Sequence, residues 1–69
     1  MVEKFVLESD YIELIKLLKV MGLCETGGMA KMAVSEGRVT VDGAVELRKR
    51  CKITRGRKVA FDGKIIEVE

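Results

Sequence analysis

The first half of the chain carries the apolar spacing of α-helices. Between about Tyr11 and Met21, apolar residues recur every three or four positions with charged residues between them, which is typical of a helix with one buried face. Asp10, followed three residues later by Glu13, has the form of a capping box, and Gly22 is well placed to end the helix. We therefore expect a helix over residues 11–21.

A second helix is expected directly after the first. Thr26 is a favourable N-cap, and the helical pattern runs to Glu36 and stops at Gly37. In this register Lys31 points outward. The residues expected to pack inward are Ala30, Ala33, Val34 and one or both of Met29 and Met32. The short link between the two helices predicts a helical hairpin.

From residue 38 onward the period of the pattern changes to two, which indicates strands. Asp42–Gly43 follows the first of these strands and is a strong hairpin signal, because both central positions of the turn need positive φ. A strict two-residue loop would place Val41 opposite Ala44 and would leave Val45 facing outward. A bulge would return Val45 to the core, and the sequence leaves this choice open.

A second hairpin is predicted around Asp62–Gly63. The apolar residues that its register places on one face are Val59, Phe61, Ile66 and Val68. A further short strand is expected over residues 4–7. Helices followed by strands in this way indicate an α+β fold.

The size and composition are those of one small folded domain, which spans residues 1–69. The chain has 48% hydrophobic and 35% charged residues, unlike a disordered tail. We find neither a secretory segment at the N-terminus nor a long uncharged apolar span, so we expect a cytoplasmic protein that does not contact membranes. We also expect a monomer.

Positive charge is concentrated in one stretch near the C-terminus. Residues 48–58 hold seven lysines and arginines and no acid, although the formal net charge of the chain is only +2. A concentrated field of this kind favours a polyanionic partner. In an extended chain Arg48, Arg50 and Lys52 would share one face. The apolar residues on the opposite face would be Leu47, Cys51 and Ile53. The alternative is a solvated strand or loop that serves solubility.

The residue types present disfavour catalysis and metal binding. The chain has no histidine, and its two cysteines, Cys24 and Cys51, form no Cys-x-x-Cys pair. A thiol–imidazole zinc site and acid–base chemistry by histidine therefore have no basis. We expect no cofactor, no metal and two reduced thiols. The cations around Cys51 would lower its thiol pKa and leave a redox role open, although packing explains this residue more simply.

The start of the second predicted helix has the features of an anion site. Gly27 and Gly28 put no side chains over the first free amides of the helix, so a phosphate could approach them, and Lys31 adds a charge one turn later. A tight turn or close helix packing explains the glycine pair equally well.

Residues 26–50 resemble the RNA-binding domain first recognised in the small-subunit ribosomal protein S-four, in particular its stand-alone, single-domain bacterial members. The matching features are the capping Thr26, Ala30 and Lys31 in the helix, Gly37 at its end, Val39 and Val41 in the strand, the Asp42–Gly43 turn, the Gly27–Gly28 pair, Glu46 and the basic cluster Arg48–Arg50. The similarity extends over residues 11–61.

The resemblance implies the αL motif, in which two helices pack on a small bent antiparallel sheet, and the second helix with the loop and strand after it binds RNA. The residues that it places on the binding face are Gly27, Gly28, Lys31, Arg38, Arg48, Lys49, Arg50 and Lys52. Arg55, Arg57 and Lys58 extend this positive surface. Two positions depart from the family: Gly27 stands where a basic residue is frequent, and Arg55-Gly56-Arg57 replaces a Pro-Gly-Asp-like turn.

The predicted function is non-catalytic recognition of structured RNA, either ribosomal or transfer RNA, with the ribosomal subunit or its assembly intermediates as the setting. Only Phe5, Tyr11 and Phe61 are aromatic. Because none lies in the basic run, we expect recognition through backbone and shape rather than base stacking. We expect Phe5 and Phe61 in the core. Tyr11 could lie in the core or serve as a platform for a base. The alternatives are a protein–protein adaptor that docks the same basic face on an acidic partner and, more weakly supported, a duplex-DNA binder.

Overall fold

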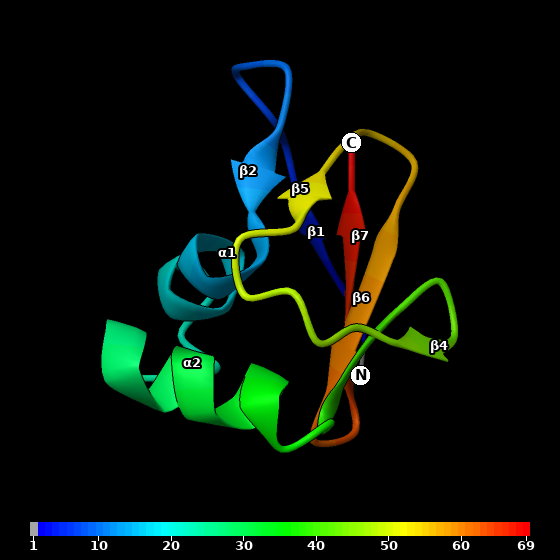
Figure 1. Cartoon of the computed structure of the whole chain (residues 1–69). Coiled ribbons are helices and arrows are strands. Elements are labelled where there is room, and N and C mark those ends of the chain that lie inside the picture. Colours follow the sequence, from blue (N-terminus) through cyan, green and yellow to red (C-terminus); the bar gives the residue numbers. More distant parts are fainter. Residues whose placement is uncertain (1) are drawn as a thin grey trace.

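The computed structural model describes residues 2–69, which form two helices and seven short strands (Figure 1). The helices are α1 (Leu14–Val20) and α2 (Gly27–Ser35). The strands are β1 (Val2–Phe5), β2 (Ile12–Glu13), β3 (Val39–Val41), β4 (Ala44–Val45), β5 (Lys52–Ile53), β6 (Lys58–Phe61) and β7 (Lys64–Val68). Within residues 2–69, neither helix is long and apolar enough to cross a membrane.

Five strands form one sheet in the order β1-β7-β6-β3-β4, and β2 pairs with β5 in a separate two-stranded ribbon. The two helices pack against each other beside these strands, as Figure 1 shows. The expected α+β fold with a helical hairpin is therefore present. The main sheet is mixed, because β1 runs parallel to β7 while its other pairs are antiparallel. β1 also begins two residues before the strand expected over residues 4–7.

The first hairpin keeps the strict two-residue register. Val41 lies opposite Ala44 in the β3–β4 pair. Asp42 and Gly43 have φ angles of 53° and 86°, as this type of turn requires. No bulge returns Val45 to the core, and its side chain is 58% exposed. Tight turn geometry thus takes precedence over burial of one valine.

The core lies between the helices and one face of the sheet. The second hairpin has the predicted register, since Val59, Phe61, Ile66 and Val68 are all buried. The helices contribute Leu14, Leu17, Leu18, Ala30, Ala33 and Val34 to the same cluster. Burial of this apolar surface is the main favourable term in the stability of so small a domain.

Helix α1 begins three residues later than predicted, and the Asp10–Glu13 capping box is wrong. Glu13 occupies the N-cap position without a side-chain cap hydrogen bond. The first amides of the helix are satisfied from another segment instead: Leu14 donates to the carbonyl of Cys51 at 2.9 Å, and Ile15 to that of Lys49 at 3.2 Å. Pairing of β2 with β5 holds the preceding residues extended, so tertiary contacts override the local helical pattern.

Helix α2 follows the prediction at both ends. The hydroxyl of Thr26 accepts a hydrogen bond from the amide of Met29 at 3.1 Å, and Gly37 has a φ of 72° just beyond the last turn. The inward placement of a methionine is wrong, because Met29 and Met32 are 49% and 61% exposed. The buried stripe by which α2 packs consists of Ala30, Ala33 and Val34 alone.

The basic run is mostly a loop, so the two faces that an extended chain would give residues 47–53 are not formed. The amide of Cys51 donates to the carbonyl of Arg48 at 3.2 Å, which closes a turn, and only the two residues of β5 are extended. Ile53 is fully buried and Cys51 is half-buried, as expected, but Leu47 is 60% exposed. The turn rotates the chain, so the period of two does not continue through it.

Candidate functional site

The basic run and the turn before β6 together form a pocket lined by positive side chains. The pocket has a volume of about 510 Å³. Its lining residues are Arg48, Arg50, Cys51, Lys52 and Arg57, four of them cationic. We call this site the cationic pocket. It unites residues that the sequence spreads over ten positions.

Contacts with the rest of the fold hold the cationic pocket in place. The loop is hydrogen-bonded to the start of α1 through the carbonyls of Lys49 and Cys51. Directly after it, Ile53 is fully buried and pairs with Ile12 in the β2–β5 ribbon. The pocket thus lies between a helix terminus and a strand whose apolar side chain is anchored in the core.

Arg48 is held by Glu46 in a bidentate ion pair. Its Nε lies 2.9 Å from one carboxylate oxygen of Glu46 and its Nη2 lies 3.0 Å from the other, while its backbone amide also donates to this group at 3.0 Å. These hydrogen bonds, the guanidinium first, lower the pKa of Glu46 to about 2. The carboxylate therefore stays charged over the whole physiological range of pH and fixes the direction of the Arg48 side chain.

Two more arginines of the pocket pair with carboxylates from other elements. Arg50 donates to Glu13 of β2 at 3.0 Å, and Arg57 donates to Asp42 of the first hairpin turn at 3.1 Å. A backbone hydrogen bond from Lys58 is the main reason that the pKa of Asp42 is lowered, and the hydrogen bond from Arg57 adds to it. Acidic groups therefore orient three of the four cations around the pocket.

These pairs orient the arginines without removing the positive field. The side chains of Arg48 and Arg50 remain 77% and 78% exposed in their pairs. A guanidinium has five N–H donors, and one carboxylate does not use them all. Residues 48–58 carry seven cations, against four carboxylates that pair with or flank them, from Glu46, Glu13, Asp42 and Glu67. An excess of positive charge remains, and exposed pairs of this kind exchange partners at little cost.

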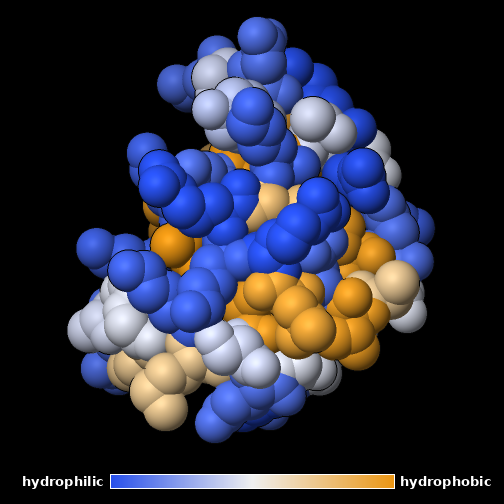
Figure 2. Space-filling model, viewed as in Figure 1, coloured by the Kyte–Doolittle hydropathy of each residue, from blue (hydrophilic) through white to orange (hydrophobic). Residues whose placement is uncertain are grey.

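The surface around the pocket is hydrophilic on one side and apolar on the other. In Figure 2, viewed as in Figure 1, hydrophilic residues gather in front of the loop that follows β4. An apolar area borders them over β4, where Val45 and Leu47 are 58% and 60% exposed. A partner that docks on this face meets both kinds of surface.

The thiol of Cys51 has the opposite perturbation from the one expected. Partial burial first, and then the negative charge of Glu46, raise the pKa of Cys51. Arg48 counteracts this only partly, because its charge is already paired with Glu46. A raised pKa removes the basis for a reactive thiolate. Cys24 is buried, and burial raises the pKa of its thiol as well.

The glycine pair at the start of α2 is not required by the backbone or by packing. Gly27 and Gly28 lack the positive φ found at Gly37. A Cβ added at Gly27 would have no neighbouring atom within 4 Å, and one added at Gly28 would lie 3.8 Å from the Thr26 hydroxyl. Neither a left-handed turn nor clearance for a methyl group therefore requires the pair. The pair begins α2, at the end of this helix that is remote from β3 (Figure 1). Neither glycine lines the cationic pocket. Lys31 is exposed on the same helix.

The other predicted cations lie outside the cationic pocket. Arg38 lies 3.6 Å from Glu36 and over the ring of Phe61, and Lys58 lies 3.7 Å from Glu67. Arg55 donates to the carbonyl of Leu7 at 3.0 Å and thereby ties the turn before β6 to the segment after β1. Lys49 is exposed, with its carbonyl bound to α1.

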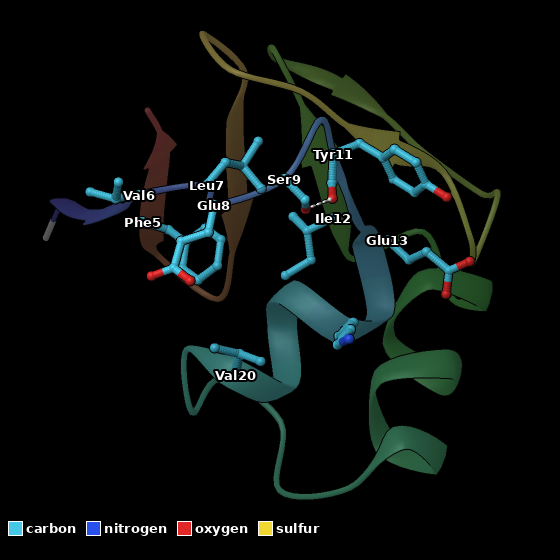
Figure 3. Close-up of a pocket in the computed structure, with 10 residues that line it drawn as sticks. Phe5, Val6, Leu7, Glu8, Ser9, Tyr11, Ile12, Glu13 and Val20 are labelled. Atoms are coloured by element: carbon cyan, nitrogen blue, oxygen red, sulfur yellow. Dashed lines mark hydrogen bonds between the residues drawn. The ribbon is translucent and has the colours of Figure 1, made fainter.

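A second pocket of about 650 Å³ lies between the segment after β1 and helix α1 (Figure 3). Its wall is mostly apolar and includes Phe5, Leu7, Ile12 and Val20. Tyr11 also lines it, at the side where its ring lies next to Lys52 of β5. All its lining residues lie between Phe5 and Val20, but they follow no motif that would mark a pocket in the sequence.

Comparison with known proteins places this architecture among described domains. Residues 5–69 match the family of the S4 domain. YbcJ of Escherichia coli, which carries the provisional name of an RNA-binding protein, is 53% identical over 61 residues, which cover 88% of this chain and 87% of YbcJ. The same figures hold for YbcJ of Shigella flexneri.

A solved structure supports the same grouping. The solution structure of YbcJ from E. coli superposes with a TM-score of 0.72 at 50% identity and covers 94% of this chain and 84% of that one. That structure is described as revealing an αL motif involved in RNA-binding. The two-helix arrangement implied by the sequence resemblance is thus the observed one.

Proposed function

We propose that this chain, which belongs to the S4 domain family, binds structured RNA without catalysing a reaction. The observation that carries the proposal is the cationic pocket, in which Arg48, Arg50, Lys52 and Arg57 surround one volume. Phosphate groups are the ligands that closely spaced guanidinium groups bind best. The description of YbcJ as an RNA-binding αL protein supports RNA as the polyanion.

Recognition would act through exchange of ion-pair partners. On binding, RNA phosphates take up free N–H donors of Arg48 and Arg50 or displace Glu46 and Glu13 from them. The same step releases counterions from the RNA, which makes the affinity fall with rising salt. Shape selectivity follows from the position of the loop backbone that carries Arg48 and Arg50, because its carbonyls bind the start of α1 and Ile53 directly after it is buried.

The finer proposal is that the RNA is ribosomal, in a subunit or an assembly intermediate in the cytoplasm. It is supported by the similarity of residues 26–50 to the domain of the small-subunit ribosomal protein S-four. Co-sedimentation with ribosomal subunits, followed by crosslink mapping, tests it. Recovery only in the ribosome-free fraction would contradict the ribosomal setting, and preferential retention of transfer RNA would replace it.

The test of RNA binding is the double variant Arg48→Glu with Arg50→Glu. We expect it to abolish binding of folded RNA while the far-ultraviolet circular dichroism stays unchanged. A matched control, Lys19→Glu with Lys64→Glu, changes the net charge equally at exposed residues outside the cationic pocket. Wild-type affinity of the first variant, or an equal loss in both, would refute the role of the pocket.

A milder variant guards against misfolding, since the new glutamates would lie near Glu46 and Glu13. Arg48→Gln with Arg50→Gln removes both charges without adding repulsion and should still weaken binding.

A protein adaptor is the second candidate function, and the exposed Val45 and Leu47 beside the pocket favour it. Retention of an acidic protein, with folded RNA and duplex DNA both unbound at matched salt, would decide for the adaptor.

A further inference from the structure

We propose that Tyr11 is a base-stacking residue at the edge of the RNA-binding surface, an inference that rests on the proposed function. It names an aromatic contact where the sequence alone indicated recognition through backbone and shape. The β2–β5 ribbon places the ring of Tyr11 beside the cations of the basic run.

Strand alternation directs Tyr11 to the outer face of the ribbon. Ile12 is 8% exposed and pairs with Ile53 on the inner face. Tyr11 and Glu13 flank Ile12, and neighbouring side chains of a strand point to opposite faces. The hydroxyl of Ser9 donates to the carbonyl of Tyr11 at 3.0 Å and fixes the backbone before the strand.

Two cations lie on the same outer face. Lys52 is paired with Glu13 across the ribbon, which makes it a diagonal neighbour of Tyr11. Its ammonium lies 5.0 Å from the centre of the Tyr11 ring, and Arg50 binds Glu13 at 3.0 Å. The ring therefore adjoins the cationic pocket directly, because Arg50 and Lys52 line that pocket as well.

Tyr11 differs from the other two rings in its exposure. Its exposed fraction is 40%, whereas Phe61 is 8% exposed and Phe5 is packed against the core. Figure 3 shows the Tyr11 ring extending on the same side as Glu13, across the pocket from Phe5 and Val20. Tyr11 thus belongs both to the wall of that pocket and to the cationic face.

A nucleotide with an unpaired base matches the Tyr11 ring and the Lys52 ammonium group. Its base is planar and stacks on an aromatic ring, while its phosphate lies close to the base and attracts an ammonium group. The ammonium of Lys52 lies over one face of the Tyr11 ring, 5.0 Å from its centre. A base therefore stacks on the opposite face or displaces the ammonium, which then pairs with the phosphate. A loop or bulge of a folded RNA offers such a nucleotide, and an uninterrupted duplex does not.

The chain contains its own reporter for this contact. Tyr11 is the only tyrosine and there is no tryptophan, so intrinsic tyrosine fluorescence comes from this one ring. We would titrate the protein with an unlabelled RNA stem-loop and with a blunt duplex of the same stem, and correct for RNA absorption with N-acetyltyrosinamide. Fluorescence anisotropy of labelled copies of both RNAs measures binding independently.

The inference predicts that the stem-loop binds more tightly than the duplex and quenches Tyr11. Tyr11→Ala should weaken stem-loop binding about tenfold or more, the usual effect of removing a stacking ring, while Tyr11→Phe stays within about twofold. Ile65→Ala, at a residue of similar exposure on the main sheet, is the matched control and should leave binding unchanged. If Tyr11→Ala lowers Tm, Tyr11→Leu, which keeps apolar bulk, replaces it.

The outcomes separate this inference from the function on which it rests. Stem-loop binding without quenching, or equal affinity of Tyr11→Leu and wild type, would overturn the stacking role and leave RNA binding in place. Failure of the wild-type protein to bind either RNA would overturn both. A loss in Tyr11→Ala that Ile65→Ala shares would show a general effect on stability and would also overturn the role of the ring.

Discussion

At the scale of single residues, the acids beside the basic run matter as much as the cations. Glu46, Glu13 and Asp42 each hold one arginine of the cationic pocket. Long arginine side chains otherwise lose considerable rotamer entropy when they bind a ligand. Partners of this kind set the directions of the arginines in advance, and they compete with phosphate for the same donors.

The first prediction concerns the pKa of Glu46. Hydrogen bonds from Arg48 lower it from an ordinary 4.5 to about 2. Because the folded-state pKa lies below the unfolded one, the stabilising contribution is present above about pH 4.5 and is lost as the pH falls toward 2. A carbon-detected NMR titration of the carboxyl group should show this midpoint, and Arg48→Gln should return it toward 4.5. An ordinary midpoint in the wild type would contradict the ion pair.

The second prediction tests exchange of partners at Arg48. Glu46→Gln keeps the shape of the side chain but releases the guanidinium from a competing charge. Because an exposed ion pair is weak, the rise in RNA affinity should be small, no more than about fivefold. Anisotropy titration measures the change, with Glu3→Gln on the distant strand β1 as the charge-matched control. Weaker binding would mean that orientation of Arg48 by Glu46 outweighs competition between Glu46 and phosphate.

At the scale of elements, the two-residue strand β5 determines the position of both the basic loop and the start of α1. It connects the basic loop to the core through Ile53, while the loop itself satisfies the first amides of α1. The start of α1 and the cationic pocket are therefore parts of one unit. The local helical pattern of residues 11–13 is overridden because strand pairing and burial of Ile12 favour the extended state.

The third prediction follows from this connection. Ile53→Ala should reduce the free energy of unfolding by about 2–4 kcal/mol, because it removes a fully buried side chain. It should also weaken RNA binding although no charge changes, since the loop loses its anchor. Urea denaturation and anisotropy measure the two effects. Ile53→Val, which costs about 1 kcal/mol, keeps the protein folded if the larger change does not.

The control for this prediction is Ile65→Ala on strand β7, where the side chain is 37% exposed. The smaller burial should make this change much less costly. Equal effects of the alanine variants at 53 and 65 on both stability and RNA affinity would show that β5 does not anchor the loop.

At the scale of the whole molecule, charge is distributed unequally over a nearly neutral chain. The net charge is +2, yet four cations line one pocket, and Lys31 and Lys49 are exposed outside it. Binding energy from such a surface comes from phosphates and counterion release. The affinity of the molecule is therefore expected to depend on salt more strongly than its net charge suggests.

The fourth prediction is a steep salt dependence of RNA binding, corresponding to about five to eight phosphate contacts. The slope of the logarithm of the association constant against the logarithm of salt concentration measures this number. Lys31→Ala should flatten the slope by less than about one unit, the effect of losing one contact. An unchanged slope would show that Lys31 is a solvated helix residue and that RNA does not reach this part of α2.

The sequence by itself determined the features that depend on neighbouring residues. The Thr26 cap, both Asp-Gly turns and the inward face of the second hairpin follow from local backbone preferences and from the side-chain period. The family resemblance, confirmed over residues 5–69, supplied the arrangement of the helices. Concentration of charge in residues 48–58 was also visible in advance.

Only the tertiary structure decided which of those charges meet in one place and which groups accompany them. The pairs of Arg50 with Glu13 and of Arg57 with Asp42 join residues 37 and 15 positions apart. The later start of α1 and the position of Tyr11 beside Lys52 depend on the pairing of β2 with β5 across a similar separation. No local pattern encodes such contacts, because they arise from the pairing of β2 with β5 and of β3 with β6 around a common core.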